Sequence, residues 1–244
     1  MIKDGINLQS GEILSFLMAG QSNMAGRGEW GVVEPIENDS CFMLRMGRWQ
    51  AMSDPVNVDR GIFQGSPRSG ISLATSFADA VQKHFDIKVG LIPCADGGTS
   101  MEQWMPGEAL FDHAVMQAGL AKRTSKLGGI LWHQGESNCK NLDPADYKKK
   151  FITMMTEFRK QLGDENLPLI IGELSPDVDE KYLRRRSLPV FNALLHEIAA
   201  ELPNCIVVSA EGLPLKEDHL HFNAVGCREF GRRYFEKYLK LIEK

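Results

Sequence analysis

The sequence lacks the cysteine patterns that stabilise many small folds. Its five cysteines are odd in number and widely spread, and no two have the Cys-x-x-Cys spacing of a zinc ribbon. A disulfide framework is therefore not indicated, and this cysteine usage favours a reducing compartment. The stability of the fold has to come from a hydrophobic core.

Long hydrophobic runs are also missing. Residues 1–5 do not begin an apolar stretch with a small-residue cleavage site, and the apolar run 13–19 is interrupted by Ser15 and much shorter than a bilayer span. We expect a soluble cytoplasmic protein without a membrane partner. A secreted location is the alternative if a signal peptide preceded this sequence.

The chain has no excess of positive charge. Its 28 Lys and Arg against 32 Asp and Glu give a net charge of −4 with mixed signs, which argues against a nucleic-acid partner. The densest basic stretch, Arg184–Arg186, lies close in sequence to Asp177, Asp179 and Glu180. We expect this stretch to be a solvated surface loop rather than an anion site.

Short apolar runs do alternate with amphipathic stretches along the 244 residues, of which 43% are hydrophobic. This alternation is typical of a parallel sheet covered by helices on both faces. The runs expected as buried strands are Ile13–Ala19, Lys88–Ala95, Gly129–His133, Pro168–Leu174 and Cys205–Ala210. We predict one domain over residues 1–244, an α/β protein with a three-layer α/β/α sandwich and a five-stranded parallel sheet.

Capping residues and apolar stripes predict the helices between these strands. The expected boundaries are Asp143-Pro144 and Gly163 for one helix, Ser187 or Leu188 for the start of the next, Asn223 for the start of the last, and residues 71–84 for an earlier one. In the helix that begins near residue 187, the residues expected to face the core are Val190, Leu194, Ile198 and Leu202. Residues 27–70 are the least regular part, with a hairpin predicted around 41–49, and we expect them to form an insertion beside the functional site.

A serine directly follows the first predicted strand, in Gly20-Gln21-Ser22-Asn23-Met24. A strand that ends beside a glycine-flanked serine exposes a hydroxyl at the edge of a sheet, as a nucleophile requires. Because Met24 replaces the second glycine of Gly-x-Ser-x-Gly, the segment departs from the nucleophile elbow of α/β-hydrolases. The alternative is that Ser22 only caps a short helix.

Near the other end of the chain, Asp218 and His221 form an Asp-x-x-His pair. If they lie on one helical turn, the carboxylate accepts the Nδ1–H of the ring and Nε2 faces Ser22, as in a serine hydrolase. The alternatives are an exposed polar loop and a metal site that uses His219 with His221. The sequence offers no other clustered His or Cys to complete such a metal site.

Two more polar loops follow predicted strands, and the carboxyl ends of parallel strands share one crevice. These loops are Asp96-Gly97-Gly98-Thr99-Ser100 and His133-Gln134-Gly135-Glu136-Ser137-Asn138. A backbone N–H of the first loop and the amide of Gln134 are candidate donors to an oxyanion, although the glycines also suit a simple tight turn. Glu136 is a candidate for structuring its loop, for a second carboxylate beside His221, or for one of a glycosidase pair.

Together the four segments resemble the SGNH (GDSL-like) hydrolase superfamily, and in particular its sialate O-acetylesterase / acetylxylan esterase branch of the carbohydrate esterases. The sequence motifs of that branch are Gly-Gln-Ser-Asn-Met, Gly-Gly-Thr-Ser, His-Gln-Gly-Glu-Ser and Asp-x-x-His. In this sequence the match spans about residues 14–222. Gln21 and Gln134 replace an Asp and an Asn of the wider superfamily, as expected in this branch. The resemblance implies the flavodoxin-like fold of SGNH hydrolases.

The resemblance also implies a role for each residue of the four segments. Ser22 is the nucleophile and His221 the general base, while Asp218 orients the base, alone or with Glu136. The implied oxyanion donors are the backbone N–H of Ser22, that of Gly97 or Gly98, and the amide of Gln134. The implied substrate contacts are Gln21, Asn23, Thr99 and Trp104, although a packed core tryptophan is an equal alternative for the last.

The function implied is that of a serine esterase that hydrolyses O-acetyl esters on carbohydrates through an acetyl-enzyme, with neither a metal nor an organic cofactor. Its partner is an acetylated carbohydrate; the sugar and the oligomeric state stay open. One alternative is a lipid esterase or thioesterase on the same fold. Two others are a carbohydrate-binding protein without turnover and a zinc hydrolase based on the two histidines.

Overall fold

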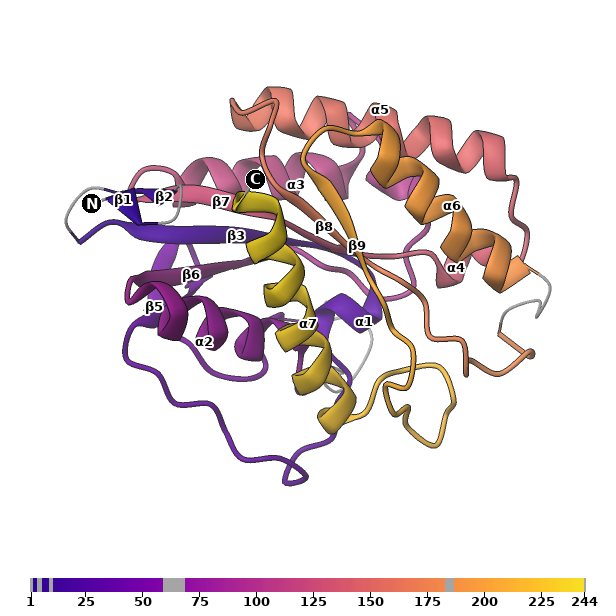
Figure 1. Cartoon of the computed structure of the whole chain (residues 1–244), viewed down its shortest axis with the longest axis horizontal. Coiled ribbons are helices and arrows are strands. Elements are labelled where there is room, and N and C mark those ends of the chain that lie inside the picture. The colour runs from indigo at the N-terminus through magenta and orange to yellow at the C-terminus, as the bar shows by residue number, and fades with distance from the viewer. Residues whose placement is uncertain (1, 4–5, 9–10, 59–68, 183–186, 244) are drawn as a thin grey trace.

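The computed structural model of the chain describes residues 2–3, 6–8, 11–58, 69–182 and 187–243 (Figure 1). Arg184–Arg186, predicted as a surface loop, and part of the predicted insertion 27–70 lie outside the described residues. None of the helices in the described ranges combines the length and hydrophobicity needed to cross a membrane.

A seven-stranded sheet forms the middle layer, with the strand order β5-β4-β6-β3-β7-β8-β9. These strands are β3 (Ile13–Gly20), β4 (Cys41–Arg45), β5 (Arg48–Ala51), β6 (Lys88–Pro93), β7 (Ser125–His133), β8 (Leu169–Gly172) and β9 (Cys205–Val208). Neighbours pair in parallel except β4 and β5, which form an antiparallel hairpin. A separate two-stranded sheet joins β1 (Ile2–Lys3) and β2 (Ile6–Asn7).

The five predicted strands are confirmed as β3, β6, β7, β8 and β9, but the prediction of a five-stranded sheet was wrong. The hairpin predicted around residues 41–49 is present, and its strand β4 extends the sheet by pairing with β6. The packing of Trp49 on β5 explains this placement. A Cβ at Gly90 of β6 would lie 2.6 Å from the Trp49 ring, so the missing side chain leaves room for the indole.

Helices cover both faces of the sheet (Figure 1). The long helices are α2 (Leu73–Phe85), α3 (Ala109–Ala121), α5 (Pro144–Leu162), α6 (Ser187–Glu201) and α7 (Ala224–Ile242), and the short ones are α1 (Ser22–Ala25), α4 (Glu136–Cys139) and the 3-10 helix η1 (Met101–Trp104). As predicted, Asp143 caps α5 by accepting from two backbone N–H groups, Gly163 ends it with φ 78°, and Asn223 caps α7.

Helix α6 buries Leu194 and Ile198 as predicted, but Val190, also expected in the core, is 49% exposed, and Phe191 is buried instead. The segment between Leu188 and Leu195 contains apolar residues at nearly every position, so the sequence pattern does not single out one stripe.

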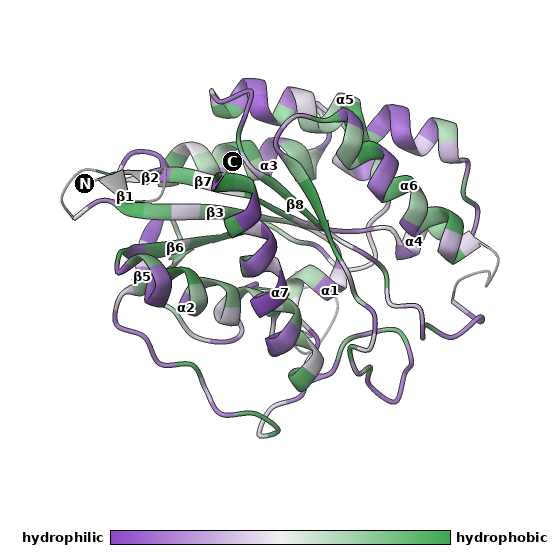
Figure 2. Cartoon of the chain, in the orientation of Figure 1, coloured by the Kyte–Doolittle hydropathy of each residue, from purple (hydrophilic) through white to green (hydrophobic). Residues whose placement is uncertain are grey.

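Two hydrophobic cores lie on opposite faces of the sheet, because successive residues of a strand point in opposite directions. Phe16 of β3 packs edge-on against Phe77 of α2 at a centroid distance of 4.8 Å, within the core that α2 and α7 cover. Leu17 lies in the second core, under α3, α5 and α6, where Trp132 packs against Phe151. Figure 2 shows the strands in hydrophobic colours between helices whose outer residues are polar. The predicted α/β/α sandwich is confirmed.

Candidate active site

Ser22 lies at the carboxyl end of the central strand β3, where the chain turns directly into α1. The turn requires glycine at position 20, since φ is 127° there and a Cβ would lie 2.1 Å from the His133 carbonyl oxygen. The backbone N–H of Gln21 donates to that carbonyl at 2.8 Å and fixes the turn on β7. Ser22 thereby becomes the first residue of a helix, where backbone N–H groups have no acceptor inside the helix.

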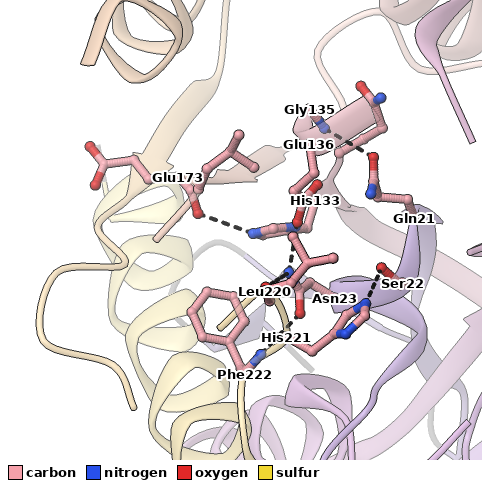
Figure 3. Close-up of polar contacts among 12 residues, drawn as sticks. Gln21, Ser22, Asn23, His133, Gly135, Glu136, Glu173, Leu220, His221 and Phe222 are labelled. Carbon is pink, nitrogen blue, oxygen red and sulfur yellow. Dashed lines mark hydrogen bonds and ion pairs between the residues drawn. The ribbon is translucent and has the colours of Figure 1, made fainter. Parts of the chain in front are cut away.

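His221 reaches Ser22 from the loop before α7, 199 residues further along the chain. Its Nε2 lies 3.0 Å from Ser22 Oγ, and its Nδ1 lies 2.7 Å from Asp218 Oδ2. The other carboxylate oxygen, Asp218 Oδ1, accepts the backbone N–H groups of Leu220 and His221 at 2.9 Å each. The structure thus brings Ser22, His221 and Asp218 into one hydrogen-bonded chain, and Figure 3 shows the contact between Ser22 and His221.

The ionisation state of Asp218 determines which ring nitrogen of His221 carries the proton. Burial raises the pKa of Asp218, but the hydrogen bonds from the His221 backbone and ring and from Leu220 outweigh it, so the pKa lies below its ordinary value. An ionised carboxylate can only accept, so Nδ1 of His221 carries the ring proton. Nε2 is then an acceptor and is placed to take the proton of the Ser22 hydroxyl.

The glycine loop, Asp96–Ser100, follows β6 and lies beside Ser22. A Cβ at Gly97 would lie 3.7 Å from Ser22 Cβ, whereas one at Gly98 would meet nothing within 4 Å. Gly97 is therefore the glycine that borders the nucleophile, which the sequence left open. The hydroxyl of Thr99 stiffens this loop by donating to the Asp96 carbonyl at 2.7 Å.

Trp104, predicted to contact substrate, belongs to the core instead. Its indole is fully buried, packs edge-on against Trp132, and donates from Nε1 to Thr99 Oγ1 at 3.0 Å. It therefore offers no surface to a substrate, and its hydrogen bond to Thr99 supports the glycine loop from the core side.

The amide of Gln134 is also committed inside the protein. Its Nε2 donates to the Thr99 carbonyl at 3.1 Å and to Asn138 Oδ1 at 2.7 Å, and its Oε1 accepts from Tyr147 Oη at 3.0 Å. Both N–H groups are used, and the side chain is fully buried. In this structure Gln134 holds the glycine loop, and its role as an oxyanion donor stays a prediction.

The other predicted substrate contacts, Gln21, Asn23 and Thr99, have buried side chains. Gln21 Oε1 accepts two long hydrogen bonds of 3.4 Å, from the backbone N–H groups of Gly135 and Ser137. Asn23 is hydrogen-bonded on both ends of its amide. These side chains join the loops of the site to one another, and their role in binding substrate stays a prediction.

Glu136 contacts Asn23 rather than His221. Its Oε1 accepts from Asn23 Nδ2 at 2.6 Å, while the ring of His221 is bonded to Asp218. Of the two carboxylates predicted to orient the histidine, Asp218 is the one in contact with it.

Arg27 borders the site and was missed by sequence reasoning. A Cβ at Gly97 would lie 2.5 Å from Arg27 Nη2, so the half-buried guanidinium and Ser22 flank the same glycine. Arg27 Nη1 donates to the Gly26 carbonyl at 2.8 Å, and the Arg27 carbonyl accepts from Lys216 Nζ at 3.0 Å. The one available signal was its position five residues after the candidate nucleophile.

A metal centre is not formed by the described residues: no three His, Cys, Asp or Glu side chains among them are grouped to hold an ion. His219, the proposed partner of His221 in a zinc site, is exposed and has a positive φ of 53°.

Known proteins resemble this chain over nearly its whole length. Residues 13–240 match the family described as carbohydrate esterase, sialic acid-specific acetylesterase. A probable carbohydrate esterase of Arabidopsis thaliana is 29% identical over 247 residues, which cover 92% of this chain and 89% of the plant protein. An X-ray structure from Arabidopsis thaliana superposes with a TM-score of 0.79 at 28% identity, over 94% of this chain and 98% of that one. The crystal structure of NanS shares the fold, with a TM-score of 0.76 at 16% identity over 94% and 97% of the two chains.

Proposed function

Since the chain belongs to the carbohydrate esterase family of sialic acid-specific acetylesterases and is a carboxylic ester hydrolase, we propose that it removes acetyl groups from carbohydrates by serine catalysis. This family membership confirms the resemblance to the SGNH carbohydrate esterases that the sequence motifs indicate. The observation that supports the mechanism is the hydrogen-bonded chain from Ser22 Oγ through His221 to Asp218.

In the first half of the reaction, Ser22 Oγ attacks the acetyl carbonyl carbon while Nε2 of His221 takes the hydroxyl proton. The resulting imidazolium is stabilised by Asp218. When the tetrahedral intermediate collapses, the bond to the sugar oxygen breaks and that oxygen leaves with the proton from His221. Ser22 is left as an acetyl ester.

In the second half, water attacks the acetyl-serine and gives its proton to the same nitrogen. Acetic acid leaves as Ser22 Oγ regains the proton from His221, and it ionises to acetate in solution, so no proton is gained or lost on the enzyme. The developing oxyanion needs donors that are already in place. The backbone N–H at the start of α1 and the backbone of Gly97 beside Ser22 are the groups proposed for this role.

The test is Ser22→Ala assayed with the wild type on acetylated sialic acid, acetylated xylan and nitrophenyl esters of increasing chain length. We expect turnover to fall by on the order of 10⁴ to 10⁶ with the fold intact by circular dichroism. A fluorophosphonate probe should label the wild type once and leave the Ser22→Ala chain unlabelled.

Each alternative function predicts a different outcome of this assay. A preference for long acyl chains would identify a lipid esterase. Binding of acetylated sugar with neither turnover nor labelling would identify a protein that has lost catalysis. Full activity of the Ser22→Ala chain would contradict the serine mechanism.

A further inference from the structure

The amide of Asn23, the residue after the proposed nucleophile, joins three segments of the chain. Its Nδ2 donates to Glu136 Oε1 at 2.6 Å and to the Leu220 carbonyl at 3.2 Å, and its Oδ1 accepts the backbone N–H of Phe222 at 3.1 Å. Figure 3 shows these side chains converging between α4, α1 and the loop before α7. Every polar atom of the amide is therefore used.

Leu220 and Phe222 are the two residues that flank His221, so Asn23 holds the backbone on both sides of the proposed base. We propose that Asn23 and Glu136 are positioning residues, which fix the backbone of His221 against the helix turn that carries Ser22. This inference rests on the proposed serine mechanism. Asp218 orients the ring of the histidine, whereas Asn23 sets the place of its backbone.

The carboxylate of Glu136 determines which way the amide of Asn23 faces. A carboxylate can only accept hydrogen bonds, so Nδ2 has to point toward Glu136 and toward the Leu220 carbonyl. Oδ1 is then left for the N–H of Phe222. The short distance of 2.6 Å is typical of a charge-assisted hydrogen bond, which is stronger than a neutral one.

The surroundings of Glu136 compensate its charge poorly. It is 7% exposed, and its Oε2 has no hydrogen-bond partner among the described residues. His133 Nδ1 lies 3.7 Å away, but Nε2 of that ring is hydrogen-bonded to the Glu173 carbonyl and so carries the proton of the neutral ring. Burial lowers the pKa of His133 more than the Glu136 charge raises it, which keeps the ring neutral.

A buried carboxylate with so few partners costs stability. If Glu136 only stabilised the fold, its replacement would lower the melting temperature and leave kcat unchanged, whereas a positioning role predicts a lower kcat without a loss of stability. In Glu136→Gln we expect kcat to fall on the order of ten- to a hundred-fold, because displacing a catalytic group slightly has that effect. KM should stay within about twofold, and the melting temperature should be unchanged or higher, since the costly charge has been removed.

Reversing the polarity of the pair gives a second test. Asn23→Asp keeps the acceptor for the Phe222 N–H but sets a second carboxylate against Glu136, and we expect a larger loss of kcat than in Glu136→Gln. The double variant Asn23→Asp/Glu136→Gln places an amide donor at position 136 against the new carboxylate at position 23. It should regain at least about tenfold of the kcat lost in Asn23→Asp alone.

The matched control is Asn192→Asp. Asn192 binds the backbone of one residue in the same way, donating to the Leu174 carbonyl at 2.9 Å and accepting the Leu174 N–H at 3.1 Å. This control loses the same kind of donated bond without touching the loop of His221. We expect it to lower the melting temperature and to leave kcat near that of the wild type.

The positioning role is overturned if Glu136→Gln has wild-type kcat, if the double variant is no more active than Asn23→Asp, or if Asn192→Asp loses as much kcat as Asn23→Asp. Ser22→Ala separates this failure from a failure of the proposed function. If Ser22→Ala is inactive and Glu136→Gln fully active, only the positioning role is wrong. If Ser22→Ala remains active, the serine mechanism itself fails.

Discussion

At the scale of single residues, Asp218 decides which nitrogen of His221 is free to act as the base. In Asp218→Asn, the amide oxygen stays with the backbone N–H groups of Leu220 and His221, so the NH2 group faces His221 and cannot accept the Nδ1–H. The ring then carries its proton on Nε2, which cannot take the proton of Ser22. We expect kcat to fall by on the order of 10⁴, with a much smaller change in KM. Steady-state kinetics and the rate of labelling by a fluorophosphonate probe measure both effects.

Glu217→Gln is the control for this substitution, because it removes the neighbouring carboxylate, which is exposed, without touching the hydrogen bonds to His221. Its kcat should be close to that of the wild type. Equal losses in the two variants would mean that the negative charge of the loop matters, and would contradict the specific role of Asp218.

Local spacing made part of the site predictable from the sequence. Asp218 and His221 are three residues apart, and Ser22 closely follows a predicted strand, so their chemistry could be proposed without knowledge of the fold. The partners of Gln134 and Trp104 were not visible. Gln134 follows β7 but binds the Thr99 carbonyl, which follows β6, so only the tertiary structure determines what its N–H groups bind. Trp104 binds the nearby Thr99, but its burial against Trp132 of β7 also depends on the tertiary structure.

At the scale of elements, the cap of α7 connects the loop of the proposed base to the core. Asn223 lies two residues beyond His221, and its Oδ1 accepts the backbone N–H of Gly226 at 2.8 Å. We expect Asn223→Ala to lower the free energy of unfolding by about 1 kcal/mol, as the loss of a helix cap usually does. Urea denaturation followed by circular dichroism measures this change.

Asn223→Ser is the conservative control, since its hydroxyl oxygen can accept the same N–H and serine is a good cap. It should retain most of the stability. If the serine variant is as unstable as the alanine variant, the side-chain hydrogen bond does not stabilise α7.

The elements that were predicted from the sequence are helices with clear capping or terminating residues and strands made of buried apolar runs. The elements that were missed lack these signals. Helix α5 has its Asp143 cap and Gly163 stop, whereas α3 follows Glu108, which makes no side-chain cap, and has no glycine at its end. Alanine and apolar residues occur around much of α3, so no single stripe marks it. The position of β4 between β5 and β6 depends on pairing with β6, a contact that no local pattern encodes.

At the scale of the whole molecule, the two cores enclose most of the thiols. All five cysteines are free, and four of them are buried. Burial raises the pKa of Cys41, Cys139 and Cys227 to about 12 each. An ordinary thiol titrates near pH 8.5, so the thiols of the unfolded chain lose their protons at a pH where those of the folded chain keep them.

This difference predicts that the fold weakens in alkali. For a group whose pKa is raised by folding, the stabilisation is complete below the pKa of the unfolded chain and is lost as the pH rises toward that of the folded chain. The free energy of unfolding should therefore fall between about pH 9 and 12, by about 1.4 kcal/mol per pH unit for each such thiol. Urea titrations at pH 8, 9, 10 and 11 measure the slope, and Cys227→Ala should make it shallower by the contribution of one thiol.

Ser76→Ala is the control, because it removes a buried hydroxyl that does not titrate. This hydroxyl donates to the Arg228 carbonyl, in the same helix as Cys227, so its loss should lower stability equally at every pH. A slope that Cys227→Ala leaves unchanged would show that this thiol already ionises within the folded protein.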